Sequence, residues 1–128
     1  MRIGALAERT GTTVPTIRYY EQVGLLRLAA RAGGQRTYDH EDVRRLAFIR
    51  RCRDLGFSIE EIRALLSLIH NRGSCTEARK LAEGHLAALR RKLAELQTLE
   101  RTIAALVAEC AVSCDNGAAP DCVILQAR

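Results

Sequence analysis

The cysteines carry the most specific chemistry in this 128-residue chain. Four of the five lie in its second half, and Cys52 stands apart from them. Thiolates are soft ligands that favour Zn(II), Cd(II), Hg(II), Pb(II) and Cu(I). In the reducing compartment that we expect, a cluster of thiols indicates metal binding or redox chemistry rather than structural disulfides. Cys52, alone on a helix, is typical of a small buried apolar residue. The clustered thiols belong to Cys75, Cys110, Cys114 and Cys122.

The arginines are the second chemical signal. Residues 1–72 carry 13 arginines and 8 acidic residues, whereas residues 73–128 carry 7 basic and 7 acidic residues. The guanidinium group makes bidentate contacts with phosphates and with guanine edges. The first part of the chain is therefore expected to bind a polyanion. A surface that is simply basic is the alternative at this point.

Composition argues against several classes of protein. Apolar residues make up 48% of the chain, which is enough for a packed core. Apolar runs stay far below the roughly 18–20 residues that span a bilayer. The first ten residues are charged too early to form a secretory signal. We therefore expect a cytoplasmic protein without a membrane segment, built as one ordinary domain or as one small domain with an extension.

Two short helices come first among the elements that position these residues. Residues 3–9 have helical periodicity, and residues 10–13 form a turn around Gly11. Thr13 is a suitable N-cap, and Pro15 fits the first turn of a second helix that ends near Gly24. Two short helices joined by a tight glycine turn predict a helix-turn-helix.

Residues 26–39 have a different character. A Gly-Gly pair separates two short stretches that favour extended backbone, which predicts a hairpin. Arg27 and Arg31 then lie on one arm, and Arg36 and Tyr38 lie on the other. A basic hairpin directly after a helix-turn-helix indicates a DNA-binding wing, and a solvated loop is the alternative.

Two longer helices are predicted next, over residues 40–55 and 59–69. The first carries Val43, Leu46, Ala47, Ile49 and Arg50 at helical spacing. A capping box from Ser58 to Glu61 starts the second, whose core stripe is Ile62, Leu65, Leu66 and Ile69. We place the end of this part at the break over residues 71–74.

A single long helix is predicted from about residue 76 to residue 109. Leucines and isoleucines recur along it at intervals of three and four from Leu86 to Leu106, and the other faces are polar or alanine. Such a narrow apolar stripe on an isolated helix favours a partner helix, so a two-stranded coiled coil and a homodimer are predicted. A helix folded back on its own domain is the alternative.

These stretches together resemble the MerR family of transcription regulators over essentially the whole chain. The resemblance lies in IGALAERTG, TIRYYEQVGLL, the hairpin ending in QRTY, FIRRCRDLGFS, EEIRALL and the long helix with terminal cysteines. It implies a mainly α fold with an N-terminal winged helix-turn-helix over residues 1–73. A dimerisation helix over residues 74–109 then forms an antiparallel coiled coil. Residues 110–128 become a C-terminal metal-binding loop and tail.

The resemblance also implies the DNA contacts. The recognition helix starts at Thr13, touches base edges with Thr16 and holds phosphates with Arg18 and Tyr19. The wing grips the flanking backbone, while Tyr20, Leu25 and Leu26 belong to the core. The implied partners are RNA polymerase and double-stranded promoter DNA with a pseudo-palindromic operator, which the dimer bends and untwists when its ligand binds. The implied DNA-binding residues are Thr13, Thr16, Arg18, Tyr19, Arg31, Arg36 and Tyr38.

The positions of the cysteines fit this arrangement. Cys75 precedes the long helix and Cys110 ends it 35 residues later, so about 50 Å separates them within one chain. They cannot share an ion there, but an antiparallel dimer brings Cys75 of one protomer to Cys110 of the other. The resemblance links this 35-residue separation to family members that sense divalent ions. The expected metal ligands are Cys75, Cys110, Cys114 and Cys122.

The identity of the ion stays open. Cys75 favours a soft divalent ion as inducer, because sensors of Cu(I), Ag(I) or Au(I) in the family tend to carry serine there. The spacing from Cys114 to Cys122 nevertheless resembles the loop of those monovalent sensors, and the Cys110–Cys122 separation is longer than in the usual mercury, cadmium or lead loop. Ligation by sulfur alone favours Hg(II), Cd(II) or Pb(II) over Zn(II). Whether Cys110 or Cys114 is the main loop ligand also stays open.

Three other hypotheses are weaker. An iron–sulfur redox sensor of the same fold needs four cysteines in one short loop, and this loop has three. A thiol enzyme needs a C-x-x-C motif or a nucleophile beside a base, so we expect no enzyme. A drug-binding regulator carries a C-terminal domain larger than residues 110–128. The favoured hypothesis is a regulator that activates a metal resistance or efflux operon.

Overall fold

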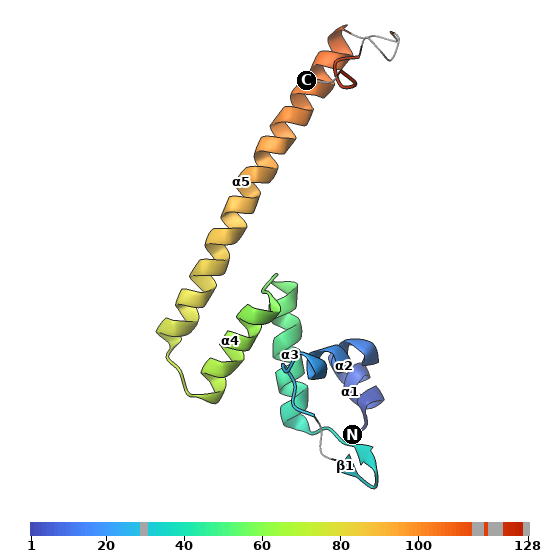
Figure 1. The fold of residues 1–128 in the computed structure, drawn as a ribbon, viewed down its shortest axis with the longest axis vertical. Helices are drawn as coiled ribbons and strands as arrows, with labels where there is room; N and C mark the ends of the chain where they lie inside the picture. The colour runs from blue at the N-terminus through green and yellow to red at the C-terminus, as the bar shows by residue number, and fades with distance from the viewer. Residues whose placement is uncertain (29–30, 114–116, 118–121, 127–128) are drawn as a thin grey trace. The chain divides into compact units, whose positions relative to one another are not determined.

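The computed structural model describes residues 1–28, 31–113, 117 and 122–126, and for residues 31 and 32 it describes the backbone alone. The described part is mainly α, as predicted, with helices α1 to α5 and one two-stranded sheet (Figure 1). It divides into two compact units, Met1–Ala82 and Glu83–Arg128. The predicted domain limits at residues 73 and 109 stay predictions.

Helices α1 (Ile3–Thr10) and α2 (Val14–Gln22) form the helix-turn-helix. Gly11 ends α1 with φ +65°, a left-handed conformation that favours glycine. The predicted N-cap is confirmed, since the Thr13 hydroxyl accepts a hydrogen bond from the Thr16 backbone N–H at 3.3 Å. Pro15 lies in the first turn, where its missing N–H leaves no bond unmade. The turn and the cap together fix the start of α2.

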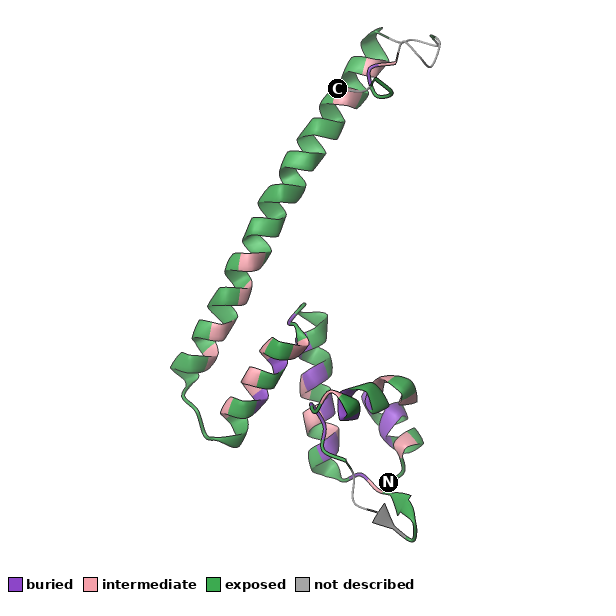
Figure 2. Cartoon of the chain, viewed as in Figure 1, coloured by how far each residue is buried: buried purple, intermediate pink, exposed green. Residues whose placement is uncertain are grey.

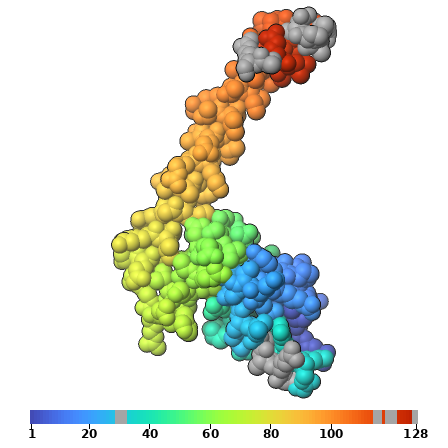
Figure 3. Space-filling model, viewed as in Figure 1, coloured from blue at the N-terminus to red at the C-terminus, as the bar shows by residue number. Residues whose placement is uncertain are grey.

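The core of the first unit lies between α1, α2, α3 (His40–Asp54) and α4 (Ile59–His70). Buried residues on these helices face one another (Figure 2), and side chains of α1 and α2 lie against those of α3 and α4 (Figure 3). Tyr20, Leu26 and Cys52 are buried, as the sequence predicts. The largest fully buried side chains are Leu6, Ile17, Leu25, Leu46, Ile49 and Ile62.

Three positions that lie at helical spacing in the two predicted helices are outside the core. Ile69 is 64% exposed, because it sits at the end of α4 beside a cavity rather than under another element. Ala47 and Arg50 are also exposed. Arg50 Nη1 donates to the Thr10 carbonyl oxygen at 2.5 Å, and so satisfies a carbonyl at the C-terminus of α1.

The wing is a short antiparallel hairpin of β1 (Arg31–Ala32) and β2 (Gln35–Arg36), with Arg31 opposite Arg36. Gly33 and Gly34 both have positive φ, which suits the two-residue turn of a twisted hairpin. The predicted arms are longer than these strands. Arg27 is not on a strand: its guanidinium contacts the carboxylates of Asp39 and Asp42, each at 3.1 Å.

Capping boxes start both helices that follow the wing. The one predicted at Ser58 and Glu61 is confirmed for α4. A second one, which the sequence pattern did not predict, joins Asp39 to Asp42 at the start of α3. In each box the two side chains satisfy two backbone N–H groups of the first turn, so both helices begin at defined residues.

Helix α5 (Cys75–Ser113) is longer than predicted at both ends. It begins at Cys75 and continues through residues 110–113, where the Ser113 hydroxyl donates to the Glu109 carbonyl oxygen at 2.7 Å. Cys110 therefore lies on the helix rather than in a loop, because no helix breaker follows residue 109 directly. None of its residues is buried, and none of the described helices is long and apolar enough to cross a membrane.

Candidate nucleic-acid interface and thiol site

The outer face of α2 carries the side chains expected to meet DNA. Thr13, Arg18 and Tyr19 are exposed and Thr16 is half-buried. The hydroxyl oxygens of Thr13 and Thr16 lie 2.8 Å apart in a hydrogen bond. Because Ile17 on the opposite face is fully buried, the orientation of the outer face is fixed by core packing.

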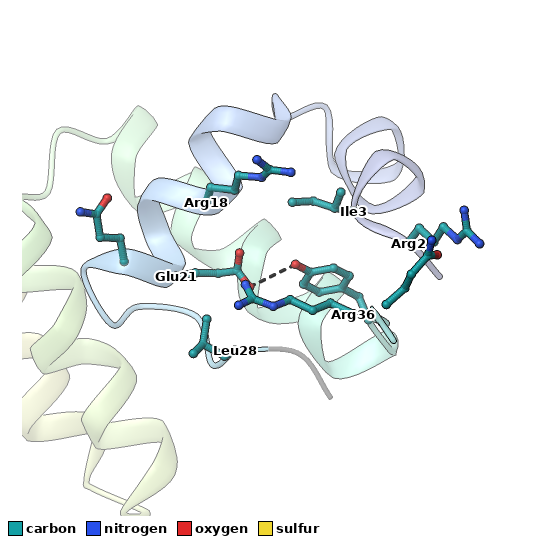
Figure 4. Close-up of a pocket in the computed structure, with 9 residues that line it drawn as sticks. Arg2, Ile3, Arg18, Glu21, Leu28 and Arg36 are labelled. Carbon is teal, nitrogen blue, oxygen red and sulfur yellow. Dashed lines mark hydrogen bonds and ion pairs between the residues drawn. The ribbon is translucent and has the colours of Figure 1, made fainter. Parts of the chain in front are cut away.

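A cavity of about 680 Å³ separates α2 from the wing (Figure 4). Arg18 of α2 and Arg36 of β2 line it, and Arg2 before α1 is a third cation that the sequence pattern did not assign. Three guanidinium groups around one concave surface suit a phosphate backbone. Gln22 and Gln35 also line it. Arg2, Gln22 and Gln35 could have been predicted from the sequence only because they lie near residues that are expected to contact DNA.

Two other predicted contacts in the wing have different outcomes. The side chain of Arg31 lies outside the described residues, so its expected contact stays a prediction. Tyr38 is 5% exposed, and its hydroxyl donates to Glu21 Oε2 at 3.1 Å. Burial, followed by the effect of Glu21, raises the pKa of Tyr38 to about 12. The Tyr38 side chain is therefore a core residue here, and a phosphate contact would require it to leave Glu21.

The thiols of Cys110 and Cys122 lie together. Their Sγ atoms are 3.6 Å apart, and both residues are half-buried. The neighbouring Val123 is 6% exposed, whereas Ile124 and Leu125 are exposed. Two sulfurs about 2.3 Å from one ion reach this separation at an angle of about 100°, so the pair fits a shared soft ion. Cys114 lies outside the described residues.

Cys75 is exposed and is the first residue of α5. It lines a shallow apolar cavity with Phe48, Leu68 and Ile69. The described residues of a single chain contain no group of three or more His, Cys, Asp or Glu that could hold an ion. Cys52 is buried in the core of the first unit, and burial raises the pKa of its thiol.

Two short helices joined by a tight turn and followed by a small hairpin have the arrangement of a winged helix-turn-helix DNA-binding regulator. The chain belongs to the MerR family. The family described as MerR HTH family regulatory protein matches residues 1–69, and the one described as MerR, DNA binding matches residues 43–106.

Three similar proteins extend over nearly all of the chain. Heavy metal-dependent transcription regulator 2 of Rhizobium meliloti is 40% identical, over 98% of this chain and 84% of that protein. The mercuric resistance operon regulatory protein of Shigella flexneri is 38% identical, over 98% and 88%. The crystal structure of the transcription regulator PbrR691 from Ralstonia metallidurans CH34 in complex with lead(II) is 41% identical, over 98% and 96%, with a TM-score of 0.86.

Proposed function

We propose that this chain is a metal-responsive transcription regulator, which binds promoter DNA as a homodimer and reshapes it when a soft divalent ion binds its cysteines. The observation that carries the proposal is the Cys110–Cys122 pair, with sulfurs 3.6 Å apart, on a MerR-family chain. A heavy metal-dependent regulator, a mercuric resistance regulator and a lead(II) complex among similar proteins support it.

The DNA surface consists of α2 and the wing. We place α2 in the major groove, where Thr16 reaches base edges. Arg18 and Arg36 face one cavity from two elements, which suits two points on one phosphate backbone. Phosphate contacts of this kind set the register of the protein on the duplex, and the base contacts supply the sequence preference. Thr13, Tyr19 and Arg31 complete the proposed surface.

The dimer follows from the exposed stripe of α5. Leu93, Leu96, Leu99 and Ile103 are all more than half exposed in the single chain. Burial of apolar surface is favourable by about 25 cal/mol for each Å² removed from water. An antiparallel coiled coil buries the stripe of each chain against the other and gives the two recognition helices a two-fold relation.

The metal site is proposed to combine both chains. Cys110 and Cys122 supply two thiolates, and the partner's Cys75 supplies a third, because Cys75 and Cys110 lie in opposite end turns of α5. Cys114 is an additional proposed ligand. When bound, a Hg(II), Cd(II), Pb(II) or Zn(II) ion supplies sulfur–metal bonds that connect the two protomers.

The chain offers a short route from Cys75 to the DNA surface. Cys75 follows α4 after a turn, and its helix is capped by Ser74, whose hydroxyl accepts from the Glu77 N–H at 3.1 Å. Ile62 and Leu66 of α4 are buried in the core that holds α2. A displacement of Cys75 therefore acts on α4 and through it on the recognition helix. We propose that this alters the bend and twist of the promoter and so its use by RNA polymerase.

Metal titration of the reduced protein tests the proposal. Hg(II), Cd(II), Pb(II), Zn(II) and Cu(I) are each added against a competing chelator, and thiolate-to-metal absorption is recorded. We expect tight binding of a divalent ion that is lost in Cys110→Ser and in Cys122→Ser and weakened in Cys75→Ser. Cys52→Ser is the matched control and is expected to bind as wild type, because Cys52 is buried elsewhere.

Other outcomes would change the proposal. Tight Cu(I) binding that is insensitive to Cys75→Ser indicates a monovalent sensor. A brown protein after anaerobic purification indicates an iron–sulfur redox sensor. Failure of every ion to bind overturns the metal-responsive part and leaves the DNA-binding family assignment in place.

A further inference from the structure

Glu21 is a buried carboxylate on the recognition helix. Its side chain is 3% exposed, and it projects from α2 toward the wing (Figure 4). A carboxylate loses hydration when it is buried, so it persists in a folded protein when polar partners compensate. Here the Tyr38 hydroxyl donates to Oε2 at 3.1 Å, and Arg36 Nη1 lies 3.9 Å from the same oxygen.

Both partners of Glu21 belong to the wing and the segment that leaves it. Arg36 ends β2, and Tyr38 follows two residues later. The backbone N–H of Tyr38 donates to the Met1 carbonyl oxygen at 2.7 Å, which ties this segment to the residues before α1. Glu21 thus connects the recognition helix with the wing by one hydrogen bond and one ion pair.

The charge of Glu21 does not favour DNA binding by itself. It lines the same cavity as Arg2, Arg18 and Arg36, where the proposed phosphate backbone lies, and a carboxylate repels phosphates. Arg36 remains 41% exposed beside Glu21. A guanidinium has five N–H donors, so it can pair with a carboxylate on one edge and a phosphate on another.

We infer that Glu21 is a positioning residue that sets the specificity of DNA binding. It holds Arg36 and Tyr38 at a fixed separation from α2, so that the wing grips the backbone when the recognition helix is in its correct register. Restricting the long Arg36 side chain before binding also lowers the entropy lost on the duplex. The inference rests on the proposed phosphate contact of Arg36.

The first test uses Glu21→Gln, which keeps an oxygen that accepts from Tyr38 but removes the charge. The probes are the duplex that wild type enriches from a random-sequence library and a scrambled duplex of the same composition. We expect the operator-to-scrambled affinity ratio to fall by roughly tenfold, which lies within the usual span of specificity ratios. Glu8→Gln, on an exposed part of α1, makes the same charge change and is expected to leave the ratio unchanged.

The second test is a double-mutant cycle with Arg36→Ala. In wild type, Arg36→Ala is expected to reduce the salt slope of operator binding by about 0.9 for each phosphate that it no longer neutralises. In the Glu21→Gln background, Arg36→Ala is expected to have a much smaller effect on operator affinity, because Arg36 is no longer held. Thermal unfolding of each variant verifies that it is folded.

The outcomes distinguish the phosphate contact of Arg36 from the positioning of Arg36 by Glu21. If Arg36→Ala leaves the salt slope unchanged, the phosphate contact of Arg36 is wrong, and the inference fails with it. If Arg36→Ala lowers the slope and yet reduces operator affinity by the same factor in wild type and in the Glu21→Gln background, Glu21 does not position Arg36. A fall in melting temperature without a change in the specificity ratio also overturns the inference, since it indicates a purely structural role.

Discussion

Tyr38 shows how one hydrogen bond changes the role of a residue. Its position in the wing predicts a contact with DNA, whereas the structure buries the ring and directs its hydroxyl to Glu21. Burial and the neighbouring carboxylate both favour the neutral phenol, which is why its pKa is raised to about 12. The buried Tyr38 side chain therefore connects the segment after the wing with α2.

The raised pKa of Tyr38 predicts the direction of alkaline destabilisation. An unfolded tyrosine has a pKa of about 10, so the contribution of Tyr38 to the stability of the folded state is complete below that pH. It is lost as the pH rises through about 12, where the folded phenol ionises. Phenolate absorbance should show a step near pH 12 that is missing in Tyr38→Phe, with circular dichroism as the control for folding. A Tyr38→Phe protein that instead lacks a step near pH 10 would contradict the assignment.

Arg18 provides a prediction about affinity. It is exposed on α2 and lines the cavity opposite the wing. If it holds a phosphate, Arg18→Ala weakens binding to all duplexes similarly and lowers the salt slope by about 0.9 for each phosphate left without its cation. Arg79→Ala, an exposed substitution near the start of α5, is the charge-matched control. An unchanged slope in Arg18→Ala would exclude the phosphate role.

At the scale of elements, the first turn of α3 combines a cap with an ion pair. Asp39 accepts from the Asp42 backbone N–H and contacts Arg27, and these interactions hold the pKa of Asp39 below its usual range. A lowered carboxyl pKa stabilises the folded state above about pH 4, and the contribution is lost as the pH falls through the folded pKa.

The variant Asp39→Asn separates the charge from the cap, because asparagine is also a good N-cap. We expect its unfolding free energy to depend less on pH below about pH 4 than that of wild type. Urea denaturation at a series of acidic pH values measures this dependence. Asp54→Asn, at the opposite end of α3, is the control and should keep the wild-type slope. Equal slopes in wild type and Asp39→Asn would assign the acid sensitivity to other groups.

How far the sequence predicts each element depends on whether local or tertiary interactions decide it. The N-cap at Thr13 and the capping box at Ser58 are local signals, and the structure has both. Arg27 and Tyr38 are predicted on the wing surface, but partners distant in sequence determine where their side chains lie. The long helix is predicted to end near residue 109, although nothing in residues 110–113 ends a helix.

The thiol site shows the same limit. Cysteine spacing identifies Cys110 and Cys122 as candidate ligands, and the structure places their sulfurs 3.6 Å apart. Val123, beside Cys122, is 6% exposed, and the cysteine spacing alone does not predict this burial. Glu21 carried no signal in the sequence, because a carboxylate beside a recognition motif is typical of a surface residue until its burial is known.

At the scale of the whole molecule, the exposed stripe of α5 predicts the oligomeric state. Leu96 is exposed near the middle of the stripe. Leu96→Arg places a charge in the proposed coiled coil and should shift sedimentation from dimer to monomer at micromolar concentration. Ala94→Arg, on the opposite face of α5, is the matched control and should remain dimeric. A dimeric Leu96→Arg protein would contradict the proposed interface.

In the proposed dimer each metal site takes ligands from both chains, and mixed dimers test this directly. One protomer carries Cys75→Ser and the other carries Cys110→Ser, with different affinity tags so that the heterodimer can be isolated. If each site takes Cys75 from one chain and Cys110 from the other, one site of the heterodimer contains the intact Cys75 of the second protomer and the intact Cys110 of the first. One complete site then remains in the heterodimer, while each homodimeric variant has none.

We therefore expect the heterodimer to bind one ion per dimer with wild-type affinity, measured by chelator competition. The Cys75→Ser homodimer should bind more weakly, and the Cys110→Ser homodimer should lose tight binding. Sites within single chains give the opposite result, because each protomer of the heterodimer then lacks one of its own ligands. Binding by the Cys75→Ser homodimer at wild-type affinity would remove Cys75 from the site altogether. The heterodimer thus tests the proposed connection between metal binding and dimer geometry. An ion shared by two chains is bound more tightly in whichever dimer arrangement brings its ligands together.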